Sequence, residues 1–220
     1  MKIIHSADIH IGAPFAYLGP KAQEKRDQLK GTFRALVDLA IAQDARLLLV
    51  AGDLFDRNEI ASADIQFVHD QLMRLHAKGI KTCLIGGTHD VLSDFPILKS
   101  PQFTHGLESV HLLDEAQPSL YLDDIGVAVV GASNYTKKSL ESPFEKLRRQ
   151  DNARLNIAMI HGSYQIPGKA AKNDFPFTAE HLDKSGFDYI AAGHWHSMLD
   201  ISTPNTKAWY AGSAEPFEFN

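Results

Sequence analysis

The sequence predicts an α/β fold in which parallel strands alternate with helices. Short apolar runs of the length of buried strands alternate with longer stretches in which apolar residues recur at helical spacing. Polar clusters follow most of these runs, where the strands of such a fold end. Hydrophobic residues make up 44% of the 220 residues, so one domain over residues 1–220 can bury a sizeable core.

The first half of the chain alternates between the two kinds of element regularly. Six apolar runs along the chain are expected to be strands: Lys2 to His5, Arg46 to Val50, Thr82 to Ile85, Val127 to Val130, Asn156 to Ile160 and Tyr189 to Ala192. Two apolar stripes between the first three runs predict helices: Leu29, Phe33, Leu36, Val37 and Ala40, then Ile65, Val68, Leu72 and Leu75. For the second helix, Ser62 is the expected N-cap and Gly79 the expected stop. Strand, helix, strand, helix, strand is the pattern of parallel βαβ units.

The second half of the chain is less regular. Ser119 to Asp123 and the run from Val127 flank a turn at residues 124–126, which predicts a β-hairpin. Ser139 to Arg149 is expected to form a short surface helix. Ile166 to Phe177 contains two prolines and a glycine and is expected to be an exposed loop.

Composition and charge limit the classes of function. The net charge is −5 with histidine neutral, so the chain lacks the basic coat of proteins that wrap nucleic acid non-specifically. Bound divalent cations would offset that charge locally and keep a nucleic-acid substrate compatible with it. The single cysteine, Cys83, forms no internal disulfide and no cysteine-rich zinc site. Apolar runs too short for a bilayer and the absence of a signal-peptide pattern lead us to expect a cytoplasmic protein, with no membrane partner.

Polar clusters follow five of the six expected strands. They share aspartate, histidine and small residues: Ser6 to His10, Ala51 to Asp56, Gly86 to Asp90, His161 with Gly162, and Gly193 to His196. In parallel α/β sheets, the side chains just beyond the carboxyl ends of strands converge on one crevice, where ligands bind. Each cluster alone is explained by a turn, a helix cap or a core histidine, but five in order at strand ends indicate a common site.

The chemistry of these clusters indicates metal ions. Aspartate and histidine together are a mixed oxygen and nitrogen ligand set, which suits Mn, Fe or Zn better than Ca or Mg alone. The clusters hold more ligands than one catalytic metal needs. Two ions about 3.5–4 Å apart, bridged by a shared carboxylate, would use the set, activate a water and clamp the oxygens of a phosphoryl centre.

The order of the motifs resembles the calcineurin-like metallophosphoesterases. That order is Asp-x-His, Gly-Asp-x-x-Asp, Gly-x-His-Asp, a lone His and Gly-His-x-His. Residues 1–12, 51–56 and 210–216 are similar to the DNA-repair nuclease branch of this superfamily, which includes bacterial SbcD. The resemblance covers nearly the whole chain, and it implies a layered sandwich of mixed β-sheets flanked by helices.

The resemblance also implies a role for each motif residue. The metal-ligating residues would be Asp8, His10, Asp53, Thr88, His161, His194 and His196. Of these, Asp8, His10 and His196 would hold the first ion, and His161 and His194 the second. Asp53 would bridge both ions, which in such families are usually manganese.

Three further residues would act beside the ions. His89 would stabilise the transition state or protonate the leaving oxygen from outside the coordination shell. Asp90 would orient His89, and Asp56 would support the loop beneath the bridging carboxylate.

The chain departs from the family pattern at two places. Thr88 stands where the family has an asparagine, so a hydroxyl replaces an amide carbonyl at the second ion; we expect a weaker or water-completed second site. The chain also stops at Asn220, before the DNA-facing capping domain of relatives and the later residues through which they meet a coiled-coil ATPase. We therefore expect residues 1–220 to be a catalytic domain that ends before the capping domain.

Three functions are compatible with this sequence. The first is a manganese-dependent exonuclease or endonuclease that processes DNA ends or breaks, located on the nucleoid if the source is bacterial. Its implied partners are DNA, an SbcC-like coiled-coil ATPase and a second copy of the chain. The second is a phosphodiesterase for small phosphoesters. The third is a DNA-end-binding or assembly subunit whose metal site is impaired by Thr88.

Overall fold

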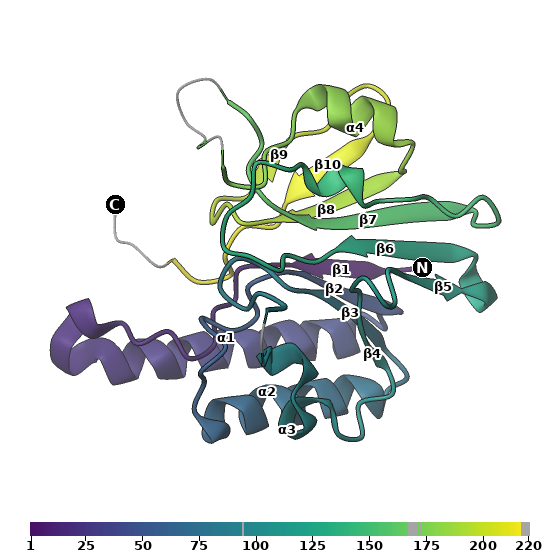
Figure 1. Cartoon of the computed structure of the whole chain (residues 1–220). Helices are drawn as coiled ribbons and strands as arrows, with labels where there is room; N and C mark the ends of the chain where they lie inside the picture. The colour runs from purple at the N-terminus through teal and green to yellow at the C-terminus, as the bar shows by residue number, and fades with distance from the viewer. Residues whose placement is uncertain (94, 167–170, 172, 217–220) are drawn as a thin grey trace.

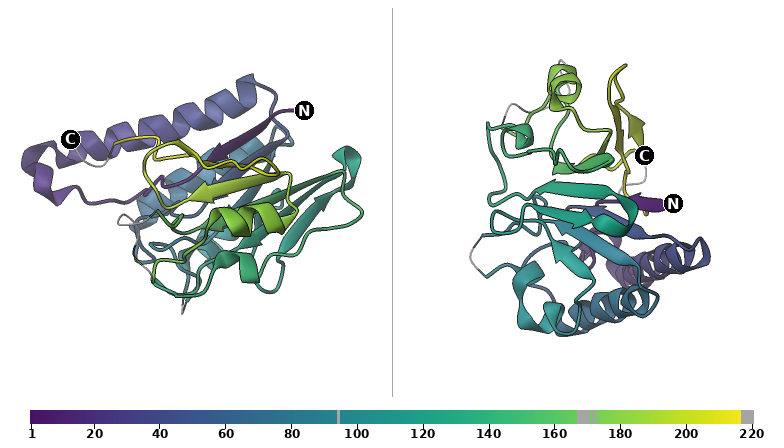
Figure 2. Two further views of the ribbon diagram at one scale, coloured as in Figure 1. Left: turned by 90° about the horizontal axis from the view of Figure 1, so that it is seen from above. Right: turned by 90° about the vertical axis from the view of Figure 1, so that its right-hand side faces the viewer.

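Two β-sheets pack face to face, and helices cover their outer faces. The computed structural model describes residues 1–216 except residues 94, 167–170 and 172. Figure 1 shows α1 (Ala22–Ala42), α2 (Ser62–His76) and α3 (Pro101–Thr104) beneath one sheet, and α4 (Ala179–Ser185) above the other. The views of Figure 2 show the same layers from above and from the side. The α/β class that the sequence predicts and the layered sandwich that the family resemblance implies are both confirmed.

The first sheet has four strands in the order of the chain, all parallel. They are β1 (Ile3–Ser6), β2 (Leu47–Ala51), β3 (Lys81–Ile85) and β4 (Val110–Leu112). The helices α1 and α2 are the two crossovers of the predicted βαβ units, and they fit the apolar stripes of the sequence. Ser62 is the first residue of α2, and Ala61 takes the N-cap position expected for it. All four strands end at the same edge of the sheet.

The second sheet has six strands in the order β5-β6-β7-β8-β10-β9 and is mixed. The strands are β5 (Ser119–Leu122), β6 (Val127–Ala132), β7 (Leu155–His161), β8 (Tyr189–Gly193), β9 (Leu199–Asp200) and β10 (Lys207–Tyr210). β5 and β9 are antiparallel to their neighbours, and the other pairs are parallel. The predicted hairpin between β5 and β6 is confirmed, with a short 3-10 turn, η3 (Asp123–Ile125), and Gly126 at φ 65°.

The apolar core lies in three layers, which explains why the strands read as continuous apolar runs. In β2, Leu47 and Leu49 face the second sheet, where Val129 and Met159 are among their neighbours in one buried cluster. Leu48 of the same strand faces α1 and α2 in another buried cluster. Both faces of the central strands are therefore buried, and alternation between polar and apolar residues is lost.

The segment after β10 returns to the first sheet. Ser213 forms a bridge to Ala7, just past β1, and its backbone N–H donates to the carbonyl of His196 at 3.0 Å. Glu215 is buried and accepts a hydrogen bond from Lys25 of α1 at 3.1 Å. This segment therefore fixes the loops after β1 and β8 relative to each other.

Two expectations for the second half of the chain are wrong. Ser139 to Arg149 contains only a one-turn 3-10 helix, η4 (Pro143–Glu145), because Pro143 offers no backbone N–H to a preceding helical turn. The stretch from Ile166 to Phe177 is not exposed throughout, since Phe175 and Phe177 are buried. The proline, glycine and lysines expected at residues 167–169 and 172 lie outside the described residues.

Candidate metal centre

The predicted site residues come from both sheets and from the carboxyl ends of their parallel strands. The first sheet supplies Asp8 and His10 after β1, Asp53 after β2, and Thr88, His89 and Asp90 after β3. The second sheet supplies His161 at the end of β7, and His194 and His196 after β8. The contacts between these loops bring the two sets together at one end of the sandwich.

The backbone is strained at four of these residues. Asp8, His10 and Asp53 have φ values of 52°, 54° and 53°, and His194 has a φ of 107°. Positive φ is uncommon for residues other than glycine, and it persists where surrounding contacts over-determine the conformation. The loops are held by their packing in a geometry that their residue types do not favour.

Asp53 lies at the centre of the cluster and is 2% exposed. Its Oδ2 lies 3.2 Å from Nε2 of His161 and 3.7 Å from Nε2 of His10. Its Oδ1 accepts a hydrogen bond from the backbone N–H of His89 at 2.8 Å. Gly87 allows this approach, since a Cβ there would come within 2.2 Å of Oδ1. The carboxylate thus faces histidines from both sheets.

Three groups of side chains bring possible ligand atoms within 4.8 Å of one another. They are Asp8 with His10 and His196, His10 with Asp53 and His89, and Asp8 with Asp53 and His161. Two buried carboxylates among imidazole nitrogens fit a divalent transition metal. Among the described residues, the ion pairs of Asp53 are with histidines. No lysine or arginine of the described chain therefore neutralises this carboxylate in place of a metal ion.

Thr88 lies beside the central carboxylate, as its position in the sequence implies. Its hydroxyl donates to Oδ2 of Asp53 at 3.3 Å and lies 3.5 Å from Nε2 of His161. The hydroxyl is therefore on the side of Asp53 that faces the second sheet.

His194 lies at the edge of this cluster. Its ring centroid is 5.1 Å from that of His161, but it is in none of the three ligand groups. Its backbone N–H donates to both carboxylate oxygens of Asp8, at 3.1 and 3.0 Å. Its Nε2 lies 2.7 Å from Oδ2 of Asp174.

The expected contact between Asp90 and His89 is wrong. Asp90 is fully buried, and its carboxylate accepts hydrogen bonds from the backbone N–H groups of residues 53, 54, 55 and 87, at 2.8–3.2 Å. The ring of His89 instead places Nδ1 2.9 Å from the backbone carbonyl of Asp56. Asp90 therefore shapes the loop that carries Asp53, and Asp56 orients His89.

Charge in the cluster is shared between carboxylates and imidazoles. Burial disfavours a charged His161, but the charge of Asp53 and a hydrogen bond to it outweigh burial and raise the pKa of His161 to about 10. Burial likewise opposes ionisation of Asp53, but attraction to His161 and His10 holds the pKa of that carboxyl far below its usual range. Burial, reinforced by the charge of Asp53, raises the pKa of Asp90 to about 6. A metal ion takes the place of such protons on its ligands, which suits this cluster to metal binding.

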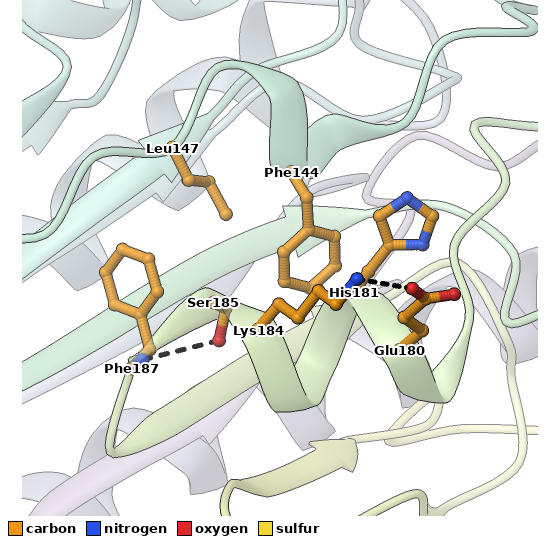
Figure 3. A pocket seen from close by; sticks show the side chains of 7 residues that line it. All are labelled: Phe144, Leu147, Glu180, His181, Lys184, Ser185 and Phe187. Atoms are coloured by element: carbon orange, nitrogen blue, oxygen red, sulfur yellow. Dashed lines mark hydrogen bonds and ion pairs between the residues drawn. The ribbon is translucent and has the colours of Figure 1, made fainter.

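A surface pocket elsewhere in the molecule is not part of this cluster. It has a volume of about 430 Å³ and lies between η4 and α4, on the outer side of the second sheet (Figure 3). Its lining consists of Phe144, Leu147, Glu180, His181, Lys184, Ser185 and Phe187. None of the predicted site residues lines it.

Asp174 is the residue of the site that sequence reasoning missed. It lies in the irregular stretch between β7 and α4, and it contacts both His194 and Ser163. In the sequence, the one feature that points to Asp174 as a site residue is its position directly before the apolar residues 175–177. Two of these three residues are buried in the structure. That feature carries no spacing rule that links residue 174 to residue 194.

Comparison with known proteins agrees with this geometry. Residues 1–198 match the family described as calcineurin-like phosphoesterase. Over 225 residues the chain is 28% identical to an uncharacterized metallophosphoesterase, YhaO, of Bacillus subtilis, covering 98% of this chain and 53% of YhaO. Over 238 residues it is 26% identical to the DNA double-strand break repair protein Mre11 of Aeropyrum pernix, covering 99% of this chain and 54% of Mre11.

A solved structure shares the fold. The protein TT1561 of Thermus thermophilus superposes with a TM-score of 0.59 at 11% identity, over 96% of this chain and 89% of that protein. The chain spans about half the length of the curated relatives it matches. Among the described residues, no helix is long and apolar enough to span a bilayer.

Proposed function

The chain belongs to the calcineurin-like phosphoesterase family, and on this premise we propose that it is a two-metal phosphodiesterase that hydrolyses DNA. The observation that carries the proposal is the position of Asp53, between His10 of the first sheet and His161 of the second. One carboxylate with imidazoles on two sides is suited to bridge two ions. Asp8, His10 and His196 would complete the first ion's ligands, and Thr88, His161 and His194 the second's.

Each residue group has a separate task in this proposal. Two divalent ions held by these residues would supply an activated water and would stabilise negative charge on phosphate oxygens. His89 lies at the surface, with a side chain that is 48% exposed, next to His10. Because the carbonyl of Asp56 only accepts, Nδ1 of His89 carries a proton and Nε2 is left for the substrate. In the doubly protonated ring Nε2 carries a proton as well, and that proton can pass to the leaving oxygen.

DNA is the proposed substrate because of the relatives and the matching motifs. The relatives include archaeal proteins named DNA double-strand break repair protein Mre11, which are 20–26% identical to this chain. We further propose manganese as the metal, a homodimer as the working state, and a coiled-coil ATPase of the SbcC type as a partner. With DNA as the substrate, we propose a cytoplasmic location, associated with the nucleoid if the source is bacterial.

A second candidate rests on Thr88. A threonine hydroxyl is shorter than the asparagine amide of the family pattern, which favours a second ion held weakly. A protein of this kind would bind DNA ends or assemble a complex with little hydrolysis. A third candidate, hydrolysis of small phosphoesters, uses the same ions with a smaller substrate.

Hydrolysis assays with Mn²⁺ separate these candidates. End-labelled linear duplex DNA and bis(p-nitrophenyl) phosphate are each incubated with the wild type, Thr88→Asn, and Asp53→Asn as the inactive control. Release of label by the wild type supports the proposal. Hydrolysis of the small ester alone contradicts the DNA substrate. Activity in Thr88→Asn alone identifies the assembly subunit, and activity in Asp53→Asn equal to wild type overturns the two-metal site.

A further inference from the structure

A carboxylate outside the family motifs lies behind one of the proposed metal ligands. Oδ2 of Asp174 lies 2.7 Å from Nε2 of His194. The same oxygen accepts a hydrogen bond from Oγ of Ser163 at 2.5 Å, and Nε1 of Trp195 donates to that Oγ at 3.3 Å. The four groups form a short chain of hydrogen bonds that ends on the imidazole.

The donors in this chain can be arranged in only one direction. An indole N–H only donates, so the Ser163 hydroxyl accepts from Trp195 and gives its own hydrogen to Asp174. An ionised carboxylate only accepts, so Nε2 of His194 carries the proton of their shared hydrogen bond. In the neutral ring this leaves the lone pair on Nδ1, so Nδ1 is the nitrogen through which the ring can bind a metal ion.

The backbone holds Asp174 in place from two sides. The N–H of Ser163 donates to the carbonyl of residue 174 at 3.0 Å, and the N–H of Phe175 donates to the carbonyl of Ser139 at 3.1 Å. Gly162 allows the close approach, since a Cβ there would lie 2.4 Å from the carbonyl oxygen of Phe175. Because Gly162 directly follows His161, Asp174 is fixed against the end of the strand that supplies another proposed ligand.

His194 is thereby attached at both ends. Its backbone N–H donates to Asp8, which follows β1, and its ring donates to Asp174 in the stretch between β7 and α4. Its φ of 107° is a conformation that its residue type rarely adopts, so contacts of this kind are needed to keep it.

We propose that Asp174 is a positioning residue that fixes the tautomer and orientation of His194 for the second metal ion. The proposal rests on the proposed two-metal site but on no particular substrate. Ligating histidines commonly donate their other ring N–H to a carboxylate, and removal of that carboxylate costs about 10- to 100-fold in metal affinity. Asp174 acts through His194, and Ser163 acts through Asp174.

Metal titration without substrate is the first test. In Mn²⁺ titrations followed by electron paramagnetic resonance, Asp174→Ala is expected to bind the second ion about 10- to 100-fold more weakly than wild type. Asp174→Asn keeps an oxygen that can accept from His194, and its affinity for the second ion is expected to lie between those of wild type and Asp174→Ala. Asp151 is an exposed aspartate that precedes the start of β7, whereas His161 lies at the end of that strand. Asp151→Ala is therefore the matched control and is expected to bind both ions like wild type. Unchanged binding of both ions in Asp174→Ala overturns the proposal.

The tautomer of His194 is the second test, and it uses the metal-free protein. Long-range ¹H–¹⁵N correlation spectra are expected to show a proton on Nε2 in wild type and a mixture of tautomers in Asp174→Ala. A proton on Nδ1 in wild type contradicts the proposal. Loss of the second ion in both Asp174 variants with the tautomer unchanged also contradicts it, because Asp174 would then be a ligand itself. If wild type bound no Mn²⁺, the proposed function would fail, while the spectra would still decide the role of Asp174.

Discussion

The two sheets contribute to the site by different chemistry. The first sheet supplies the carboxylates Asp8, Asp53 and Asp90, and its loops are tied together by backbone N–H groups that donate to them. The second sheet ends in the imidazoles of His161 and His194, whose rings are held by a carbonyl and by Asp174. The negative charge of the site is therefore built into the first sheet, and most of the second sheet's contribution is nitrogen ligands.

This difference shows how much each side depends on the other. The carboxylates of the first sheet are buried beside histidines from the second, and the pKa values of Asp53 and His161 are shifted by each other. Replacement of a carboxylate on the first sheet removes charge that several groups share, whereas replacement of a histidine on the second sheet removes one ligand. We therefore expect the larger effects from changes on the first sheet.

Replacement of the central carboxylate gives the largest expected effect. Asp53→Asn removes the charge shared by both ions, and hydrolysis should fall on the order of 10³-fold or more. Initial rates with saturating Mn²⁺ measure the effect, and circular dichroism checks the fold. His194→Ala is the comparison on the second sheet. If it loses as much hydrolysis as Asp53→Asn or more, the larger effect expected from changes on the first sheet is contradicted.

Asp90→Asn tests how the first sheet shapes its loop. In the wild type, four backbone N–H groups donate to the two carboxylate oxygens of Asp90. In the variant, an amide N–H₂ replaces one of these oxygens and cannot accept their hydrogen bonds. The free energy of unfolding should fall by about 2–4 kcal/mol, because buried N–H groups lose their acceptor. Urea denaturation measures it. A variant as stable as wild type would show that the loop keeps its shape without this carboxylate.

His5 lies at the seam between the sheets, where its Nδ1 is 3.0 Å from the hydroxyl of Tyr189. Burial lowers the pKa of His5 to about 4 from 6.5, so between those pH values the unfolded chain binds more protons than the folded one. The contribution of neutral His5 is complete above pH 6.5 and is lost as pH falls toward 4. Wild type should lose roughly 2–3 kcal/mol over this window relative to His5→Gln. Parallel denaturation curves at about pH 7 and about pH 4 measure the difference, and equal losses would contradict it.

Thr88→Asn gives the smallest expected effect. The amide reaches further than the hydroxyl toward the side of Asp53 that faces His161, so affinity for the second Mn²⁺ should rise by about tenfold. Equilibrium dialysis compares the two proteins, with Thr88→Val as the variant that has no hydroxyl. Equal second-site affinity in wild type and Thr88→Asn would show that Thr88 does not weaken the second site.

The strands and the ligand motifs could be predicted from the sequence because both are local patterns. The run from Leu47 to Ala51 and the cluster that follows it identify a buried strand and a site in one stretch. The strand β4 and the hairpin of β9 and β10 were not predicted, because two to four residues carry too little periodicity.

The contacts between loops could not be predicted. Asp174 meets His194 only because Gly162 and the backbone of Ser139 hold its segment beside β7. The family resemblance implies that Asp90 orients His89, but the carboxylate accepts hydrogen bonds from the backbone of residues 53–55. Such contacts depend on the packed geometry of both sheets rather than on spacing in the sequence.

In the proposed site the two sheets jointly hold two metal ions around Asp53. The most direct test counts the Mn²⁺ ions bound per chain by inductively coupled plasma mass spectrometry after equilibrium dialysis. The comparison includes wild type, His10→Ala on the first sheet and His161→Ala on the second. We expect two ions per chain in wild type and one in each variant. A single ion in wild type that is lost in both variants would contradict this expectation.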